Sequence, residues 1–283
     1  MTKNAVQSIK DVSDQVPDFM KNEKAGLGTE SLSQDALTPP RLKLAQLVSP
    51  ELDTIPGLKA GQWFNSLGET NYGDKVLIIP CYLTESYLLF QPRVGDIKGG
   101  LLARSNDGIH WDPPNVTFEV TIDKKGTKVK WVTKNTVRES GLAAWGSLDP
   151  SDPKSQPAAT WSLNTVVMFP EHEEDGPAVL SFMRSGAKVG KKFAGNLKMS
   201  RTPSFGRVFE LTSEKIGSGG DAYFEPRIRA AGFITRPELY NKGKEIYEMA
   251  KERGVQVDAS PADVDEPASA PANKRAGDDE VPF

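Results

Sequence analysis

Between residues 75 and 212 the sequence repeatedly shows short runs of β-branched and aromatic residues that are separated by turn-forming residues. Residues 116–122 and 127–133 alternate apolar with polar side chains, and residues 123–126, Asp-Lys-Lys-Gly, have the composition of a tight turn. Alternation with a period of two on both sides of a turn predicts a β-hairpin over 116–133. We therefore expect the chain to fold around a β-sheet.

Other segments extend this sheet. Residues 75–84 form a β-rich run, and residues 86–91 are either its continuation or its hairpin partner. The same composition predicts further strands at 161–169, 178–183 and 206–212.

Two helices are predicted beside the strands. The stretch 235–253 opens with a capping box, Thr-Arg-Pro-Glu, which is typical of a helix start. Val189, Phe193 and Leu197 follow one another every four residues, so they share one face of a second helix over 185–197. The predicted fold class is mainly β, with one internal helix and one closing C-terminal helix.

Charge is distributed unevenly along the chain. The formal net charge is −3, but residues 1–38 carry −2 and residues 256–283 carry −5, which leaves +4 on residues 39–255. Residues 256–283 consist almost wholly of Asp, Ala, Pro, Ser and Glu, and such a segment cannot bury enough apolar surface to fold. We expect a flexible N-terminal segment (1–38), a folded basic body (39–255) and a disordered acidic tail (256–283).

Composition excludes several classes of protein. Mean hydropathy is −0.45, no apolar run is long enough to span a membrane, and no apolar stretch follows Met1 as in a secretory signal. Cys81 is the single cysteine and His110 and His172 are the two histidines, so we expect no metal site and no cofactor. No nucleophile has a plausible base. We therefore expect a cytoplasmic protein that is not an enzyme.

A basic stretch is the first candidate site. Residues 176–209 contain no Asp or Glu but seven basic residues, and like charges gathered in one place favour a polyanionic partner. The alternative is an ordinary solvated helix face. The candidate DNA contacts are Arg184, Lys188, Lys191, Lys192, Lys198 and Arg201.

Aromatic and basic residues interleaved on predicted strands form the second candidate. Bases of single-stranded DNA stack on aromatic rings, while Lys and Arg hold the phosphates. For each ring taken alone, packing in the core is the competing interpretation. The candidates are Tyr87, Arg93, Lys128, Lys130 and Trp131.

The chain ends in a third distinctive motif, which carries three acids, an aliphatic residue, Pro and a C-terminal Phe. An apolar pocket rimmed by basic residues in a partner protein would bind both the ring and the terminal carboxylate. The alternative is a solubilising acidic tail. The partner-binding candidates are Asp278, Asp279, Glu280, Val281, Pro282 and Phe283.

This terminus resembles the acidic tip of bacterial single-stranded DNA-binding proteins, and the likeness covers these six residues. The body, including residues 40–46 and 61–66, is similar to proteins encoded by tailed bacteriophages. The resemblance implies an elaborated OB-fold-like barrel with a helix between its third and fourth strands. It also implies a phage protein in the cytoplasm of the bacterial host that recruits replication and recombination enzymes through its tip. The sequence leaves the oligomeric state open, a homo-oligomer included.

Taken together, these features favour a protein that binds and protects single-stranded DNA without sequence specificity during phage DNA replication or recombination. One alternative is a phage structural or assembly protein that contacts duplex DNA. Another is a nuclease whose carboxylates meet only in the fold. If the first interpretation is right, the acidic tail is expected to occupy the empty DNA groove and to be displaced when DNA binds.

Overall fold

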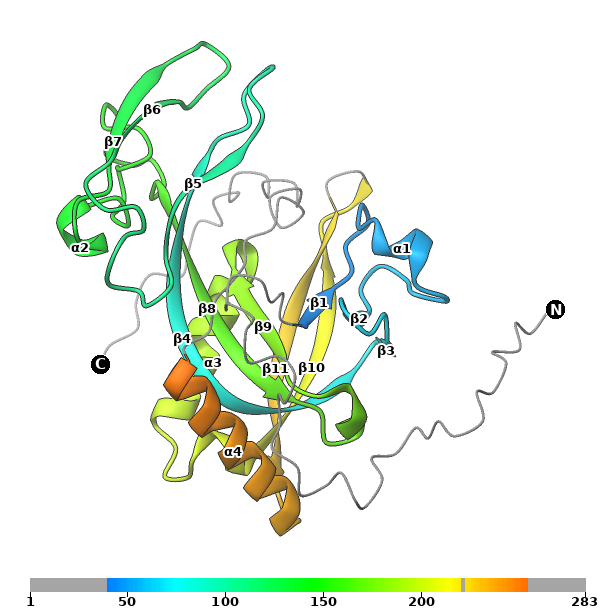
Figure 1. The fold of residues 1–283 in the computed structure, drawn as a ribbon. Coiled ribbons are helices and arrows are strands. Elements are labelled where there is room, and N and C mark those ends of the chain that lie inside the picture. Colours follow the sequence, from blue (N-terminus) through cyan, green and yellow to red (C-terminus); the bar gives the residue numbers. More distant parts are fainter. Residues whose placement is uncertain (1–39, 220–221, 254–283) are drawn as a thin grey trace, which may run out of the picture. The chain divides into compact units, whose positions relative to one another are not determined.

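The computed structural model describes residues 40–219 and 222–253 (Figure 1). The predicted flexible segment 1–38 and the predicted tail 256–283 lie outside this range. The strands are β1 (Arg41–Leu44), β2 (Trp63–Asn65), β3 (Asn71–Gly73), β4 (Val76–Gln91), β5 (Gly100–Ser105), β6 (Thr117–Thr121), β7 (Lys128–Val132), β8 (Ala159–Met168), β9 (Ala178–Met183), β10 (Arg207–Ile216) and β11 (Tyr223–Phe233). The helices are α1 (Glu51–Thr54), α2 (Val137–Ser140), α3 (Ala187–Lys198) and α4 (Pro237–Arg253).

One sheet contains nine of these strands. Its order is β11-β10-β4-β8-β9-β1-β2-β3, with β5 paired to the far end of β4, while β6 and β7 form a separate hairpin. The predicted hairpin over 116–133 is confirmed. Residues 76–91 form the single strand β4, so 86–91 continue the run rather than form a hairpin with it, and a β-bulge lies between Pro80 and Tyr82.

The connections within the sheet follow the order of an OB-fold. The long strand β4 pairs antiparallel with both β8 and β10, β8 continues to β9, and β10 continues to β11. Helix α3 lies between β9 and β10 in the chain, which are the third and fourth strands of this five-strand set. The sheet curls strongly into a half-barrel (Figure 1). The predicted class, a mainly β elaborated barrel with one internal and one closing helix, is confirmed.

Alternation along β8 and β9 explains the barrel core. Leu163 and Val167 of β8 and Leu180 and Phe182 of β9 point to the inside, and each is at most 2 % exposed. Burying one such side chain stabilises the fold by about 1.5–3 kcal/mol. The barrel is therefore held chiefly by apolar packing.

Helix α3 closes one end of this core. Phe193 is buried, and Val189 and Leu197 pack against the same cluster, as the four-residue spacing predicts. Gly190 lies so close to β9 that a Cβ atom there would stand 2.6 Å from the Cβ of Phe182. Helix and sheet can approach this closely only because residue 190 has no side chain.

Helix α4 covers part of the outer face of the sheet. Leu239, Ile246 and Ala250 pack against Cys81 and Met168. Burial raises the pKa of the Cys81 thiol to about 12, so the thiol stays protonated at neutral pH. No helix within the described ranges is long and apolar enough to cross a membrane.

The short strand β1 is inserted at the seam of the barrel. It pairs parallel with β9 on one side and antiparallel with β2 on the other. Beyond β1, the side-chain amide of Gln46 bonds the backbone of Phe224 in β11, accepting from its N–H at 2.8 Å and donating to its carbonyl at 3.0 Å. The Gln46 side chain thus makes the two hydrogen bonds that a backbone peptide group would make, and it links the segment after β1 to β11.

Candidate nucleic-acid interface

Three aromatic residues lie on β4 and β8 near the end of the sheet where β4 continues toward β5. Tyr87 of β4 and Trp161 of β8 are direct cross-strand neighbours, so their side chains lie on the same face. Phe90 follows three residues after Tyr87. All three rings are half-buried, which leaves part of each accessible.

Two cations lie over these rings. Lys191 of α3 places its Nζ 5.1 Å from the centre of the Trp161 ring, and the guanidinium carbon of Arg184 lies 5.9 Å from the centre of the Phe90 ring. At exposed sites each cation–π contact is worth about 0.5–1 kcal/mol. We call Tyr87, Phe90, Trp161, Arg184 and Lys191 the aromatic–basic cluster.

Local chain geometry brings the two cations to this end of the sheet. Met183 at the end of β9 pairs with Ser162 of β8, so the next residue, Arg184, reaches the level of Trp161. Arg184 has a positive φ of 49°, and the chain turns there into the short helical turn that precedes α3. Exposed Lys188 stands one turn before Lys191 and therefore lies on the same side of α3.

The structure disperses the other predicted basic contacts. Lys192, Lys198 and Arg201 are exposed on or beyond α3. Lys128 and Lys130 lie on the outer face of the β6–β7 hairpin, where Lys128 Nζ is 3.6 Å from a carboxylate oxygen of Glu119. Arg93 is exposed in the connection between β4 and β5. Of the predicted set, Arg184 and Lys191 lie over the rings of Phe90 and Trp161, and Tyr87 is the cross-strand neighbour of Trp161.

Trp131, a DNA-contact candidate from the sequence, is buried in the structure. Its side chain is 1 % exposed and packs with Trp111, Val120 and Leu89 in a second apolar cluster. The ring therefore stabilises the region between β4 and β8, and it presents no face to a base. The predicted tip, residues 278–283, lies outside the described residues.

Sequence reasoning does not select Trp161 as a contact. A signal is present, because Trp161 has the same parity as Leu163 and Val167 and so belongs to the core-facing side of β8. Only the position of Trp161 at the start of the strand, next to the end of the core, leaves its ring half-exposed.

The connection between β4 and β8 is much longer than a simple loop. It contains β5, the β6–β7 hairpin and α2, and it encloses the second apolar cluster. In OB-folds the loop between the first and second strands is among the elements that contact oligonucleotides. This elaboration begins directly beside the aromatic–basic cluster.

A polar network lies on the outer face of β4, β8 and β9. Asn164 accepts hydrogen bonds from the hydroxyls of Ser162 (3.1 Å) and Ser181 (2.8 Å) and donates one to Ser86 (2.8 Å). Ser86, Ser162 and Asn164 are fully buried. These bonds join three strands in one register.

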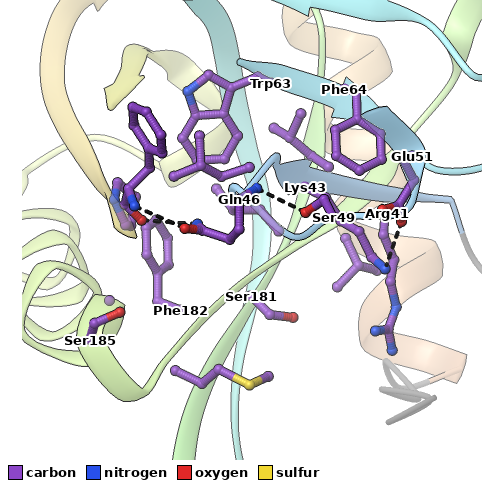
Figure 2. A pocket seen from close by; sticks show the side chains of 18 of the residues that line it. Arg41, Lys43, Gln46, Ser49, Glu51, Trp63, Phe64, Ser181, Phe182 and Ser185 are labelled. Carbon is purple, nitrogen blue, oxygen red and sulfur yellow. Dashed lines mark hydrogen bonds and ion pairs between the residues drawn. The ribbon is translucent and has the colours of Figure 1, made fainter. Parts of the chain in front are cut away.

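A pocket lies between β1, β9 and β11 (Figure 2). Its volume is about 160 Å³. Gln46 lies at its centre, with Trp63 and Phe64 on one side and Ser181 and Ser185 on the other (Figure 2). The residues that flank Arg184, Met183 and Ser185, line it as well, so the pocket adjoins the aromatic–basic cluster.

The acidic loop after β8 pairs with side chains of other elements. Among the described residues no three His, Cys, Asp or Glu side chains are grouped to hold a metal ion. Glu173 in the acidic loop after β8 instead bonds Arg236, and Asp175 accepts a hydrogen bond of 2.7 Å from the Tyr72 hydroxyl. These contacts hold the loop after β8 against Tyr72 and Arg236.

Comparison with known proteins gives one relationship. The model of the Pam3 phage gp34-like protein family matches residues 7–256. No curated protein matches the chain, and no solved structure matches it.

Proposed function

The chain belongs to the Pam3 phage gp34-like protein family, and from this premise we propose that it is a non-catalytic protein that binds single-stranded DNA without sequence specificity. The observation that carries the proposal is the aromatic–basic cluster at the end of an OB-type sheet. Its role would be to protect single strands during phage DNA replication or recombination.

The chemistry of the cluster fits an unpaired strand. A base stacked on an accessible aromatic ring contributes about 1–3 kcal/mol, while Lys191 and Arg184 are placed to attract the adjoining phosphates. In duplex DNA the base faces are already stacked and cannot reach Trp161 or Tyr87. The cluster therefore favours single strands over duplex.

The C-terminal tip would provide the second half of this function. Asp278, Asp279, Pro282 and Phe283 resemble the tip by which bacterial single-stranded DNA-binding proteins recruit replication, recombination and repair enzymes. Its acidic residues would be repelled by DNA, so the tip would stay available for a protein partner while the body holds the strand.

Fluorescence anisotropy with labelled oligo-dT and with a duplex of equal length tests the proposal. We expect preference for the single strand and an affinity that falls steeply between ~50 and ~200 mM salt. The variants Arg184→Ala and Lys191→Ala should weaken binding, and Lys244→Ala, an exposed lysine of α4, is the matched control. Equal binding of duplex would instead support a structural or assembly role.

A further inference from the structure

We propose that the pocket between β1, β9 and β11 takes one pyrimidine base of the bound strand. This inference rests on the proposed function, because the ligand would be part of a DNA strand held by the aromatic–basic cluster. It assigns a role to a cavity that the cluster itself does not use.

Position connects the pocket to the cluster. Ser185 and Gly186 line the pocket, and they directly follow Arg184, which lies over Phe90. A strand held at Arg184 is therefore one or two residues of protein chain away from the cavity. A nucleotide adjoining the stacked bases could turn its base into the pocket while its phosphate stayed near Arg184.

The walls suit a flat ring. Half-buried Phe224 contributes aromatic surface and half-buried Met183 a polarisable thioether, while Trp63 and Phe182, each 1 % exposed, support the wall from the core. An apolar cavity of about 150 Å³ accepts benzene, so about 160 Å³ accommodates a six-membered pyrimidine ring. A two-ring purine is larger and would fit less well.

The polar groups suit the edge of a base. The Ser185 hydroxyl makes no hydrogen bond within the described part of the chain, and a hydroxyl can both donate and accept. The amide of Gln46 is already bonded to the backbone of Phe224, so it holds the wall in place rather than reading the base. A single adaptable hydroxyl accepts either thymine or cytosine.

Charge around the pocket favours a nucleotide over a neutral ligand. Arg41 and Lys43 of β1 line it, and Arg184 adjoins it. Glu51, the acidic residue of the lining, lies 3.7 Å from Lys43 Nζ, so these two charges offset one another. Among the described residues at the pocket, basic side chains outnumber acidic ones, which suits the phosphates that flank an inserted base.

Two substitutions at one position test the assignment. Ser185→Phe fills the cavity, while Ser185→Ala removes the hydroxyl and leaves the space. We expect Ser185→Phe to weaken binding of oligo-dT about tenfold and binding of oligo-dA by less than twofold, so that the dT/dA ratio falls. Ser185→Ala should weaken oligo-dT by about threefold or less. An unchanged dT/dA ratio in Ser185→Phe would overturn the inference.

A measurement on the unaltered protein avoids any dependence on a variant that folds poorly. Titration with thymidine monophosphate, followed by amide NMR, should shift the Gln46 side-chain signals and the Ser185 signal before those of the β6–β7 hairpin. Shifts confined to other regions would refute the pocket. If the pocket fails while Lys191→Ala still weakens oligo-dT, the proposed function stands without it; if the protein has no preference for single strands, the proposed function itself fails.

Discussion

Substitution of Trp161 separates base stacking from phosphate attraction at the aromatic–basic cluster. The ring is half-buried against the barrel core and lies under Lys191 at 5.1 Å. Trp161→Leu keeps an apolar side chain against the core but removes the π-face. Loss of one stacked base at about 1–3 kcal/mol corresponds to a weakening of about 5- to 150-fold.

The dependence on salt distinguishes the two contributions. Because Trp161→Leu removes no charge, the slope of log affinity against log salt should stay constant. Lys191→Ala should instead reduce the magnitude of this slope by about 0.7 for each phosphate of the single strand that the protein no longer neutralises. Trp161→Phe restores a ring and should recover most of the affinity.

Anisotropy titrations of oligo-dT at four salt concentrations measure both quantities, and thermal melting controls for loss of the fold. An unchanged affinity in a folded Trp161→Leu variant would refute base stacking at this residue. A change of slope in that variant would also contradict the reasoning, because it would mean that the substitution acts by displacing Lys191.

Three further predictions concern the tail, the core and an acidic turn. Deletion of residues 278–283 should tighten binding of oligo-dT at low salt, since it removes three negative charges, and equal affinity would refute competition by the tail. Gly190→Ala should lower the free energy of unfolding by about 1–3 kcal/mol in urea titrations, because its Cβ would meet Phe182; a neutral result would mean that α3 moves freely. Partial burial raises the pKa of Asp107, but hydrogen bonds from His110 and its neighbours outweigh this and lower it to about 2. This contribution to stability is present above about pH 4 and is lost as pH falls toward 2, so Asp107→Asn should flatten acid unfolding in that range.

The parts of the fold that sequence predicts are those in which local pattern and tertiary packing agree. The β6–β7 hairpin alternates and carries its own turn, and α3 shows its buried stripe directly. Strand β11 is not predicted, because Pro226 and two arginines interrupt its apolar pattern. It forms a strand because Arg227 and Arg229 make ion pairs with glutamates of β10. These glutamates lie more than ten residues away in sequence, so a local pattern does not reveal them.

The candidate site is likewise predicted only in part by the sequence, because some of its features depend on tertiary contacts. Lys191 and Arg184 can be identified from charge alone, since an acid-free stretch is visible in sequence. Choosing between Trp131 and Trp161 requires the sheet, because both occupy core-facing positions and only one stands at an open end. The pocket cannot be predicted from sequence, because two of the strands that line it, β1 and β9, are separated by more than a hundred residues in the chain.

The parallel pairing of β1 with β9 also bears on how the protein is made. Arg41 is synthesised early, but its partner Val179 follows 138 residues later. At 5–20 residues per second, the ribosome needs roughly 7–28 s to supply that partner. During this interval β1 has β2 as a neighbour and an open edge on its other side. Completion of the seam must therefore be a late step in biosynthesis, and a nascent chain halted before residue 178 would lack both the complete sheet and the pocket.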